Sequence, residues 1–187
     1  MTRTFESWEL TLENKQAYEA AKKYADKFDN YKEKGVGIMM SGTNTGTGKT
    51  HLAAAIAIEL INQGIPVIMN TMIRLLRKIK DTYDDEIKTK GAESSIIELY
   101  STVDLMIIDD LGKERPTEWV LEKLYDIISA RYENLLPVII TTNYDIDRLR
   151  DRLTVKNNTE TAEAIVSRLN EMCVGIEMNW KDWRLKY

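Results

Sequence analysis

The residues best suited to chemistry lie in a glycine-rich stretch, Gly42–Thr50, which follows a short apolar run and precedes residues with helical spacing. Glycines let a backbone curl so that several N–H groups point at one anion, and the positive end of the next helix faces the same point. In such a loop Lys49 would reach the β- and γ-phosphates of a nucleotide, and the Thr50 hydroxyl would bind Mg²⁺. The predicted nucleotide-binding residues are Gly42, Thr45, Gly46, Thr47, Gly48, Lys49, Thr50 and His51.

The loop is one residue longer than the usual phosphate-binding pattern. Five residues separate Gly42 from Gly48, and Thr43 stands where the pattern has its first glycine. The half nearest the phosphates, Gly46–Thr50, is intact. A glycine-rich turn that merely joins a strand to a helix is the alternative, but the order of strand, loop, lysine, hydroxyl and helix favours phosphate binding. His51 follows the loop directly and is interpreted as a helix residue rather than a base.

Polar side chains also follow two later apolar runs. Asp109 and Asp110 end the run Val103–Ile108, and Asn143 ends the run Pro137–Thr142. Ligands of open α/β sheets gather at the carboxyl ends of the strands. Asp109 would hold Mg²⁺ directly or through water, Asp110 would polarise the attacking water, and the Asn143 amide could orient that water. For Asn143 alone, an ordinary turn asparagine is the stronger interpretation.

Bulk properties limit the possible classes of protein. The chain has 187 residues, 43% of them hydrophobic and 30% charged, which fits one globular domain. It has no apolar stretch near the ~20 residues of a membrane span, and its start has no apolar signal core. Cys173 is the only cysteine, so no intrachain disulfide can form, and the expected location is cytoplasmic. A net charge of −4 argues against strong non-specific nucleic-acid binding but leaves room for a local basic strip.

Apolar periodicity predicts alternating strands and helices. Strands are expected at about 36–41, 65–70, 103–108, 137–142 and 174–178. Helices are expected at about 14–29, 49–63, 71–82, 93–101, 116–134 and 161–172. This alternation predicts an α/β fold in which a parallel five-stranded sheet lies between helices.

Several motifs together make the chain similar to a known family. They occupy residues 41–54, 107–112, 130–132, 140–144, 166–169 and 182–184. With them the chain resembles the ATPase core of the DnaC/DnaI-type helicase loaders, which belong to the AAA+ ATPases and have the IstB transposition helper as a close relative. The resemblance covers about residues 5–184. It implies a P-loop NTPase of the AAA+/ASCE type, as one domain with a lead-in and helix over 1–34 and a P-loop core over 35–187.

The resemblance also implies how the protein works. AAA+ proteins assemble in rings or spirals in an ATP-dependent way, and an arginine of one subunit reaches the γ-phosphate bound by its neighbour. Arg168 matches the position of this arginine finger. Sequence alone would favour a surface arginine in a salt bridge, and the resemblance shifts the interpretation to the finger. Arg131 is expected, with less support, near the same interface. Few residues follow Arg168, so we expect little or no helical lid, and the helicase-binding N-terminal module of the loaders is absent from the sequence.

A DNA contact is expected on the basic stretch after the second strand, where the family has a helix that holds single-stranded DNA. The cations are Arg74, Arg77, Lys78 and Lys80. They could bind phosphates on one side of a helix, while Ile73, Leu76 and Ile79 face the core. A solvated basic face, balanced by nearby acidic residues, is an equally good interpretation.

Three functions remain open at this point. The first is an ATPase of DNA replication, weak as an isolated domain, that loads or remodels a DnaB-type replicative helicase on single-stranded DNA. The second is an IstB-like transposition helper that binds duplex DNA and a transposase. The third is a small-molecule P-loop kinase, which would need a substrate pocket and usually an arginine-rich lid, and neither is visible in the sequence.

Overall fold

The computed structural model describes residues 3–84, 92–113, 115–156 and 159–183. Its centre is a five-stranded sheet in the order β2-β3-β4-β1-β5, and every neighbouring pair of strands is parallel. The strands are β1 (Gly37–Ser41), β2 (Val67–Thr71), β3 (Leu105–Leu111), β4 (Val138–Thr142) and β5 (Cys173–Glu177). The predicted α/β class and parallel sheet are therefore confirmed.

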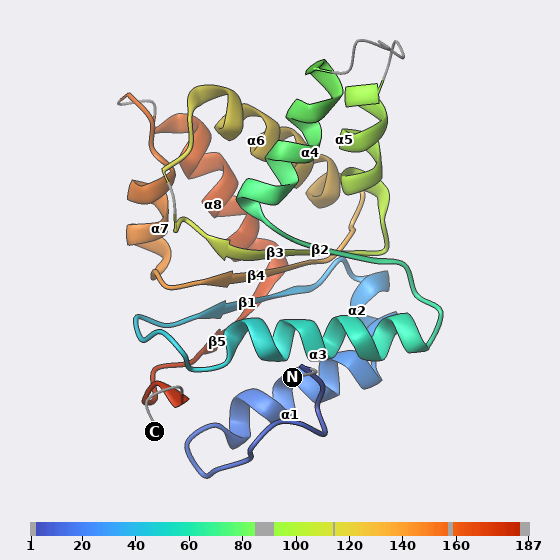
Figure 1. Ribbon diagram of the computed structural model, residues 1–187, viewed down its shortest axis with the longest axis vertical. Helices are drawn as coiled ribbons and strands as arrows, with labels where there is room; N and C mark the ends of the chain where they lie inside the picture. The colour runs from blue at the N-terminus through green and yellow to red at the C-terminus, as the bar shows by residue number, and fades with distance from the viewer. Residues whose placement is uncertain (1–2, 85–91, 114, 157–158, 184–187) are drawn as a thin grey trace.

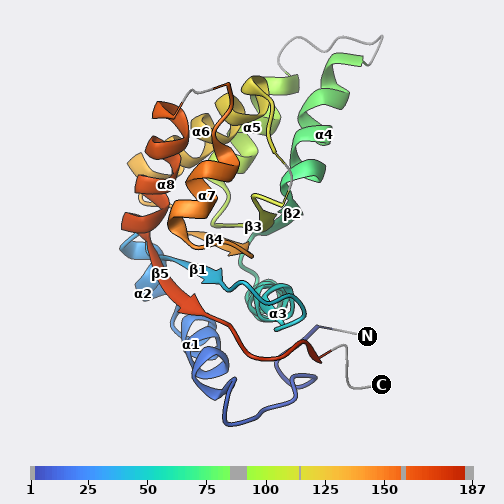
Figure 2. The same ribbon diagram turned by 90° about the vertical axis from the view of Figure 1, so that its left-hand side faces the viewer.

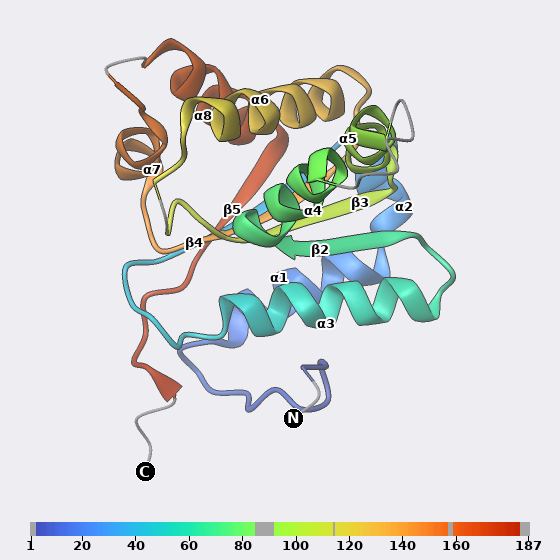
Figure 3. The same ribbon diagram turned by 45° about the horizontal axis from the view of Figure 1, so that its top comes forward.

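Helices cover both faces of the sheet (Figure 1). One face carries α1 (Lys15–Asp26), α2 (Phe28–Glu33) and α3 (Lys49–Asn62). The other carries α4 (Met72–Asp84), α5 (Ala92–Thr102), α6 (Glu118–Glu133), α7 (Ile146–Leu153) and α8 (Glu160–Met172), as Figure 3 shows from above. Among the described residues, none of these helices has the length and apolar character needed to cross a membrane.

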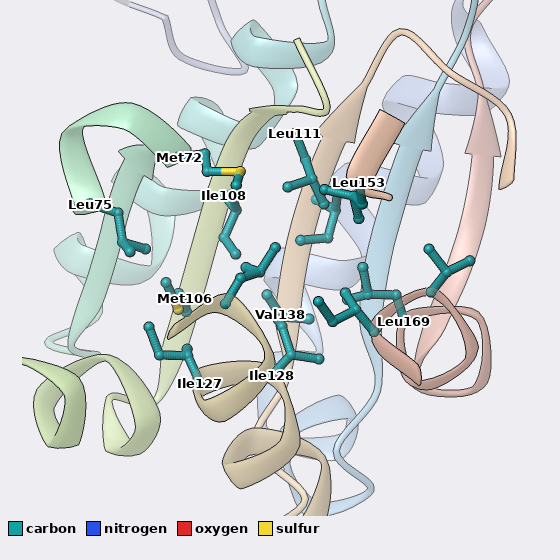
Figure 4. Close-up of a cluster of buried hydrophobic side chains, with 14 of the residues drawn as sticks. Met72, Leu75, Met106, Ile108, Leu111, Ile127, Ile128, Val138, Leu153 and Leu169 are labelled. Atoms are coloured by element: carbon teal, nitrogen blue, oxygen red, sulfur yellow. The ribbon is translucent and has the colours of Figure 1, made fainter. Parts of the chain in front are cut away.

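The central strands are apolar up to their carboxyl ends because helices bury both of their faces. Successive side chains of a strand point to opposite faces. In β3, Met106 and Ile108 belong to the core under α4–α8, whereas Leu105 and Ile107 belong to the core under α1 and α3. Figure 4 shows the first of these cores. The buried runs thus hold the sheet in a register that brings the carboxyl ends of the strands to one edge.

The observed helices differ from the predicted ones in two places. The helix expected over 14–29 is divided into α1 and α2 at Lys27, whose φ of −121° is not helical. Helix α7 was not predicted at all. Its N-terminal signal is Asp145, whose carboxylate accepts a 2.8 Å hydrogen bond from the backbone N–H of Arg148. Leu149 and Leu153, four residues apart, bury one face of this short helix.

Candidate nucleotide-binding site

The predicted phosphate-binding loop joins the end of β1 to the start of α3. Gly46 and Gly48 both have left-handed backbone angles, with φ of 68° and 94°, which residues with a side chain rarely adopt. Gly48 directly precedes the first turn of α3, where the backbone N–H groups of a helix are available to an anion. The glycine spacing seen in the sequence therefore has a direct conformational cause.

Lys49 lies inside the curl of this loop. Its side chain is only 6% exposed, and its Nζ donates to the backbone oxygens of Gly42 at 3.2 Å and Asn44 at 2.8 Å, and to Thr47 Oγ1 at 3.3 Å. A buried ammonium group needs such acceptors, because burial without them is costly. The loop thus holds one positive charge at its centre, next to the N-terminal end of α3. This arrangement suits a phosphate chain.

Thr50 and Asp109 meet at the same edge of the sheet. Thr50 Oγ1 donates to Asp109 Oδ1 at 2.9 Å, and Thr141 Oγ1 donates to the same oxygen at 2.6 Å. The three residues come from α3, β3 and β4. A carboxylate beside a hydroxyl is the hard oxygen set that Mg²⁺ takes from a protein when nucleotide phosphates supply other ligands. In the described part of the chain no three acidic, histidine or cysteine residues cluster as a metal cage, and such a Mg²⁺ site needs none.

Asp110 sits in a distortion of β3. The register with β4 shifts between Ile108 and Leu111, and Asp110 has a φ of 57°. A bulge of this kind re-aims a side chain, and a left-handed residue that is not glycine costs about 1 kcal/mol or more. The backbone N–H of Asp110 donates to Thr141 Oγ1 at 2.9 Å, and its carboxylate lies 3.3 Å from Lys113 Nζ. Successive carboxylates therefore point in different directions.

Thr141 is a site residue that the sequence analysis missed. Its buried hydroxyl donates a hydrogen bond to Asp109 Oδ1 and accepts one from the backbone N–H of Asp110. The only signal was a threonine inside an otherwise apolar run, and strands commonly contain threonine. Asn143, predicted to orient water, is half-buried just beyond β4, at the edge where Ser41 pairs with Thr142.

His51 links the lead-in segment to α3. Its Nε2 lies 2.9 Å from the backbone oxygen of Thr4 and 3.3 Å from Ser7 Oγ, and its ring meets the edge of Trp8 at 5.2 Å between centroids. A carbonyl oxygen only accepts, so Nε2 carries the hydrogen in this contact. The geometry gives His51 a packing role beside the loop.

Arg168 lies on α8 against α6. Its guanidinium carbon is 5.1 Å from the centre of the Tyr125 ring and 5.7 Å from that of Tyr132, and Nη1 donates to Ala164 O at 3.1 Å. These contacts hold the side chain away from the phosphate-binding loop of its own chain.

Arg131 is not at an interface. It is completely buried, and its guanidinium donates to the backbone oxygens of Tyr100 at 2.9 Å, Pro137 at 2.7 Å and Asp104 at 3.5 Å. Desolvation by burial lowers the pKa of Arg131 to about 10. The expectation that it lies near a neighbouring subunit is wrong, because the side chain ties the N-terminal ends of β3 and β4 to α5.

The basic stretch forms α4, which begins directly after β2. Arg74, Arg77 and Lys78 are exposed, and the side chain of Lys80 lies outside the described residues. The expected core face was partly wrong. Leu75, 1% exposed, packs in the core with Met72 and Ile79, whereas Ile73 is 42% exposed. The side chain of Leu76 also lies outside the described part.

Comparison with known proteins identifies the family. A family model described as IstB-like ATP binding protein matches residues 1–187. The replicative helicase loader DnaC of Escherichia coli (strain K12) is 26% identical over 164 residues, which are 83% of this chain and 64% of DnaC. The replicative helicase loader DnaI of Bacillus subtilis (strain 168) is 27% identical over 139 residues, 74% of this chain and 43% of DnaI. The chain thus spans less than two thirds of the length of these relatives.

A solved structure agrees with this assignment. The crystal structure of the DnaC helicase loader superposes with a TM-score of 0.77 at 26% sequence identity, over 94% of this chain and 96% of that one. The chain belongs to the family of IstB-like ATP binding proteins and has the P-loop AAA+ fold.

Proposed function

We propose that this protein hydrolyses ATP and uses the cycle to load or remodel a DnaB-type replicative helicase on single-stranded DNA. The observation that carries the ATPase part is the meeting of Thr50, Asp109 and Thr141 beside the phosphate-binding loop. The loader part is supported by the similarity to DnaC, which extends over most of this chain. A cytoplasmic location follows from this proposed work on DNA.

In this proposal the loop binds the phosphates of ATP. The N–H groups of Gly46–Lys49 and the start of α3 face the phosphate oxygens, and Lys49 exchanges its loop carbonyls for the β- and γ-phosphates. Thr50 and Asp109 would hold Mg²⁺, which would neutralise part of the charge on the phosphates. Thr141 keeps the Asp109 carboxylate in place through its 2.6 Å hydrogen bond.

The attacking water is oriented by this chain's own side chains. Asp110 accepts a hydrogen bond from that water and takes up its proton as the oxygen bonds to the γ-phosphorus. The bond from this phosphorus to the bridging oxygen breaks at the same time, so ADP leaves with the bridging oxygen and phosphate is released. Lys113, 3.3 Å from the Asp110 carboxylate, competes for it in the resting protein. Asn143 lies on the neighbouring strand end and donates its amide hydrogen to the γ-phosphate or the water.

We propose that catalysis is completed between subunits. Arg168 of one subunit would reach the γ-phosphate of its neighbour in an ATP-dependent ring or spiral. Single-stranded DNA would lie against α4, where Arg74, Arg77 and Lys78 are exposed and can contact phosphates.

An IstB-like transposition helper is the second candidate, and it is favoured by the family model that matches the whole chain. The two candidates share the ATPase core and differ in their partner. The test is a pull-down with purified replicative helicase and, in parallel, with transposase, each with ATP and without nucleotide. ATP-dependent retention of the helicase supports the loader. Retention of the transposase alone overturns it and supports the helper.

A further inference from the structure

The chain beyond β5 returns to the phosphate-binding loop. Figure 2 shows this segment running from the end of β5 past the N-terminal end of α3. Residues Asn179–Trp183, here called the C-terminal brace, contact the loop over Thr43–Thr47. Nothing in the sequence predicted this contact, because the two segments are more than 130 residues apart.

The brace binds the loop carbonyls nearest the predicted phosphate position. The Trp180 indole Nε1 donates to Thr47 O at 2.9 Å, and the backbone N–H of Trp183 donates to Gly46 O at 3.2 Å. The C=O and N–H of one planar peptide unit point in opposite directions. Holding these two carbonyls on the brace side therefore turns the N–H groups of Thr47 and Gly48 to the other side, where a phosphate would bind.

In a third peptide unit the N–H group, and not the carbonyl, faces the brace. The N–H of Thr43 donates to Asn179 Oδ1 at 2.9 Å, which directs the carbonyl of the same peptide unit away from the brace. That carbonyl belongs to Gly42, and it accepts the 3.2 Å hydrogen bond from Lys49 Nζ. One contact with the brace thus sets the acceptor that holds the catalytic lysine. The side chain of Asn44 adds hydrogen bonds to the backbone oxygens of Asn179 and Trp180.

Close packing against this region also explains two glycines. A Cβ on Gly42 would lie 2.3 Å from Met178 O, and a Cβ on Gly46 would lie 1.6 Å from Asp182 Oδ1. The contact at position 42 is with backbone and would displace the chain. At position 46 the Asp182 carboxylate would have to turn away, and the φ of 68° also favours glycine there. The extra residue of the loop lies in this supported part, between Gly42 and Gly46, so the longer loop has a partner that keeps it in one conformation.

We infer that Asn179 and Trp180 are positioning residues for nucleotide binding. From the outer side of the loop they orient two of its peptide units, and the backbone N–H of Trp183 holds the third. This inference rests on the proposed binding of ATP to the loop. Coupling between two sites is reciprocal. If the docked brace favours ATP binding, bound ATP must stabilise the docked brace to the same extent.

The test uses the Trp180→Phe variant, which keeps an aromatic ring and loses the indole N–H. Trp119→Phe, on α6 in the opposite core, is the matched control. Calorimetry with Mg–ATP should show a Kd about fivefold higher for Trp180→Phe, as expected for one lost hydrogen bond. The control should keep the Kd of the parent chain.

Asn179→Ala provides a second variant at an exposed position, so that it folds even if Trp180→Phe does not. It should also raise the Kd severalfold, while the melting temperature without nucleotide changes little. In the parent chain, added ATP should slow amide hydrogen exchange at Trp183.

The possible outcomes distinguish a failure of the proposed function from a failure of this inference. A parent chain that does not bind ATP overturns the proposed function and this inference with it. A parent chain that binds ATP, with a Kd for both variants within twofold of its own, overturns only the inference. A merely structural role of the brace would lower the melting temperature of the variants and leave their Kd unchanged.

Discussion

Thr50 Oγ1 donates a 2.9 Å hydrogen bond to Asp109 Oδ1, although 59 residues separate the two in the chain. The contact joins the first turn of α3, which follows the phosphate-binding loop, to the end of β3. It places a hydroxyl and a carboxylate where a Mg²⁺ ion could bind both. The fold reaches this geometry because α3 and β3 begin or end at the same edge of the sheet.

Replacing Lys49 should weaken nucleotide binding. Lys49→Ala removes the cation that meets the β- and γ-phosphates, and a lost charge-assisted hydrogen bond corresponds to about a 10- to 100-fold rise in Kd. Calorimetry with Mg–ATP measures the change, and Lys34→Ala, at an exposed position after α2, serves as the control. An unchanged affinity of Lys49→Ala would falsify the assignment of the loop.

Asp109 and Asp110 should have separable roles. In Asp109→Asn the remaining amide oxygen can still accept from Thr50 and Thr141, so the fold should persist while Mg²⁺-dependent ATP binding falls. In Asp110→Asn the left-handed backbone is tolerated, because asparagine adopts it readily. That variant should bind ATP normally and hydrolyse it about 10²- to 10⁴-fold more slowly. Phosphate release and ATP affinity are measured for both, and hydrolysis by Asp110→Asn at the parent rate contradicts its role.

Thr141→Val should affect both stability and Mg²⁺-dependent binding. The change keeps the shape of the side chain and removes the hydroxyl that serves Asp109 and the N–H of Asp110. A buried polar group left without its partner costs about 1–3 kcal/mol of unfolding free energy. Urea unfolding and the Mg²⁺ dependence of ATP binding report the two effects. Thr154→Val, which loses only a hydrogen bond to Arg150 O at the end of α7, is the control. Equal behaviour of the two variants would remove Thr141 from the site.

Charge reversal on α4 should reduce binding to single-stranded DNA. Arg77 and Lys78 are exposed, and loss of two phosphate contacts should flatten the slope of log K against log salt by about 1.4. Fluorescence anisotropy with ATP present measures Arg77→Glu combined with Lys78→Glu. Lys27→Glu with Lys34→Glu, on the face of α1 and α2, matches the net charge. If both double variants lose the same affinity for single-stranded DNA, only the net charge of the protein matters, and α4 is not a DNA-binding site.

Hydrolysis should depend on contact between subunits. Arg168→Ala keeps its own loop, and Lys49→Ala keeps its finger, so each alone should be nearly inactive. A mixture should recover part of the activity at mixed interfaces, and activity per subunit of the parent chain should rise with concentration. Phosphate release is measured over a range of protein concentrations and mixing ratios. A rate that does not depend on concentration, with no recovery on mixing, would show that one subunit completes catalysis alone.

Local patterns of residues were enough to predict the features whose geometry depends on neighbours in the chain. Left-handed glycines and a lysine followed by threonine identified the loop, because their spacing follows from the curl of a few peptide units. Apolar runs identified the strands, and parallel pairing then placed Asp109 at the edge where the loop lies.

Contacts between distant segments could be seen only in the folded chain. Thr141 and the C-terminal brace support the site through hydrogen bonds to β3 and to the loop. Thr141 has no local pattern that distinguishes it from an ordinary strand residue, and the motif at 182–184 does not indicate which segment it contacts. Arg131 shows the same limit. The family resemblance predicted a place near a subunit interface, yet the side chain is completely buried, and three backbone carbonyls from different segments accept hydrogen bonds from its guanidinium.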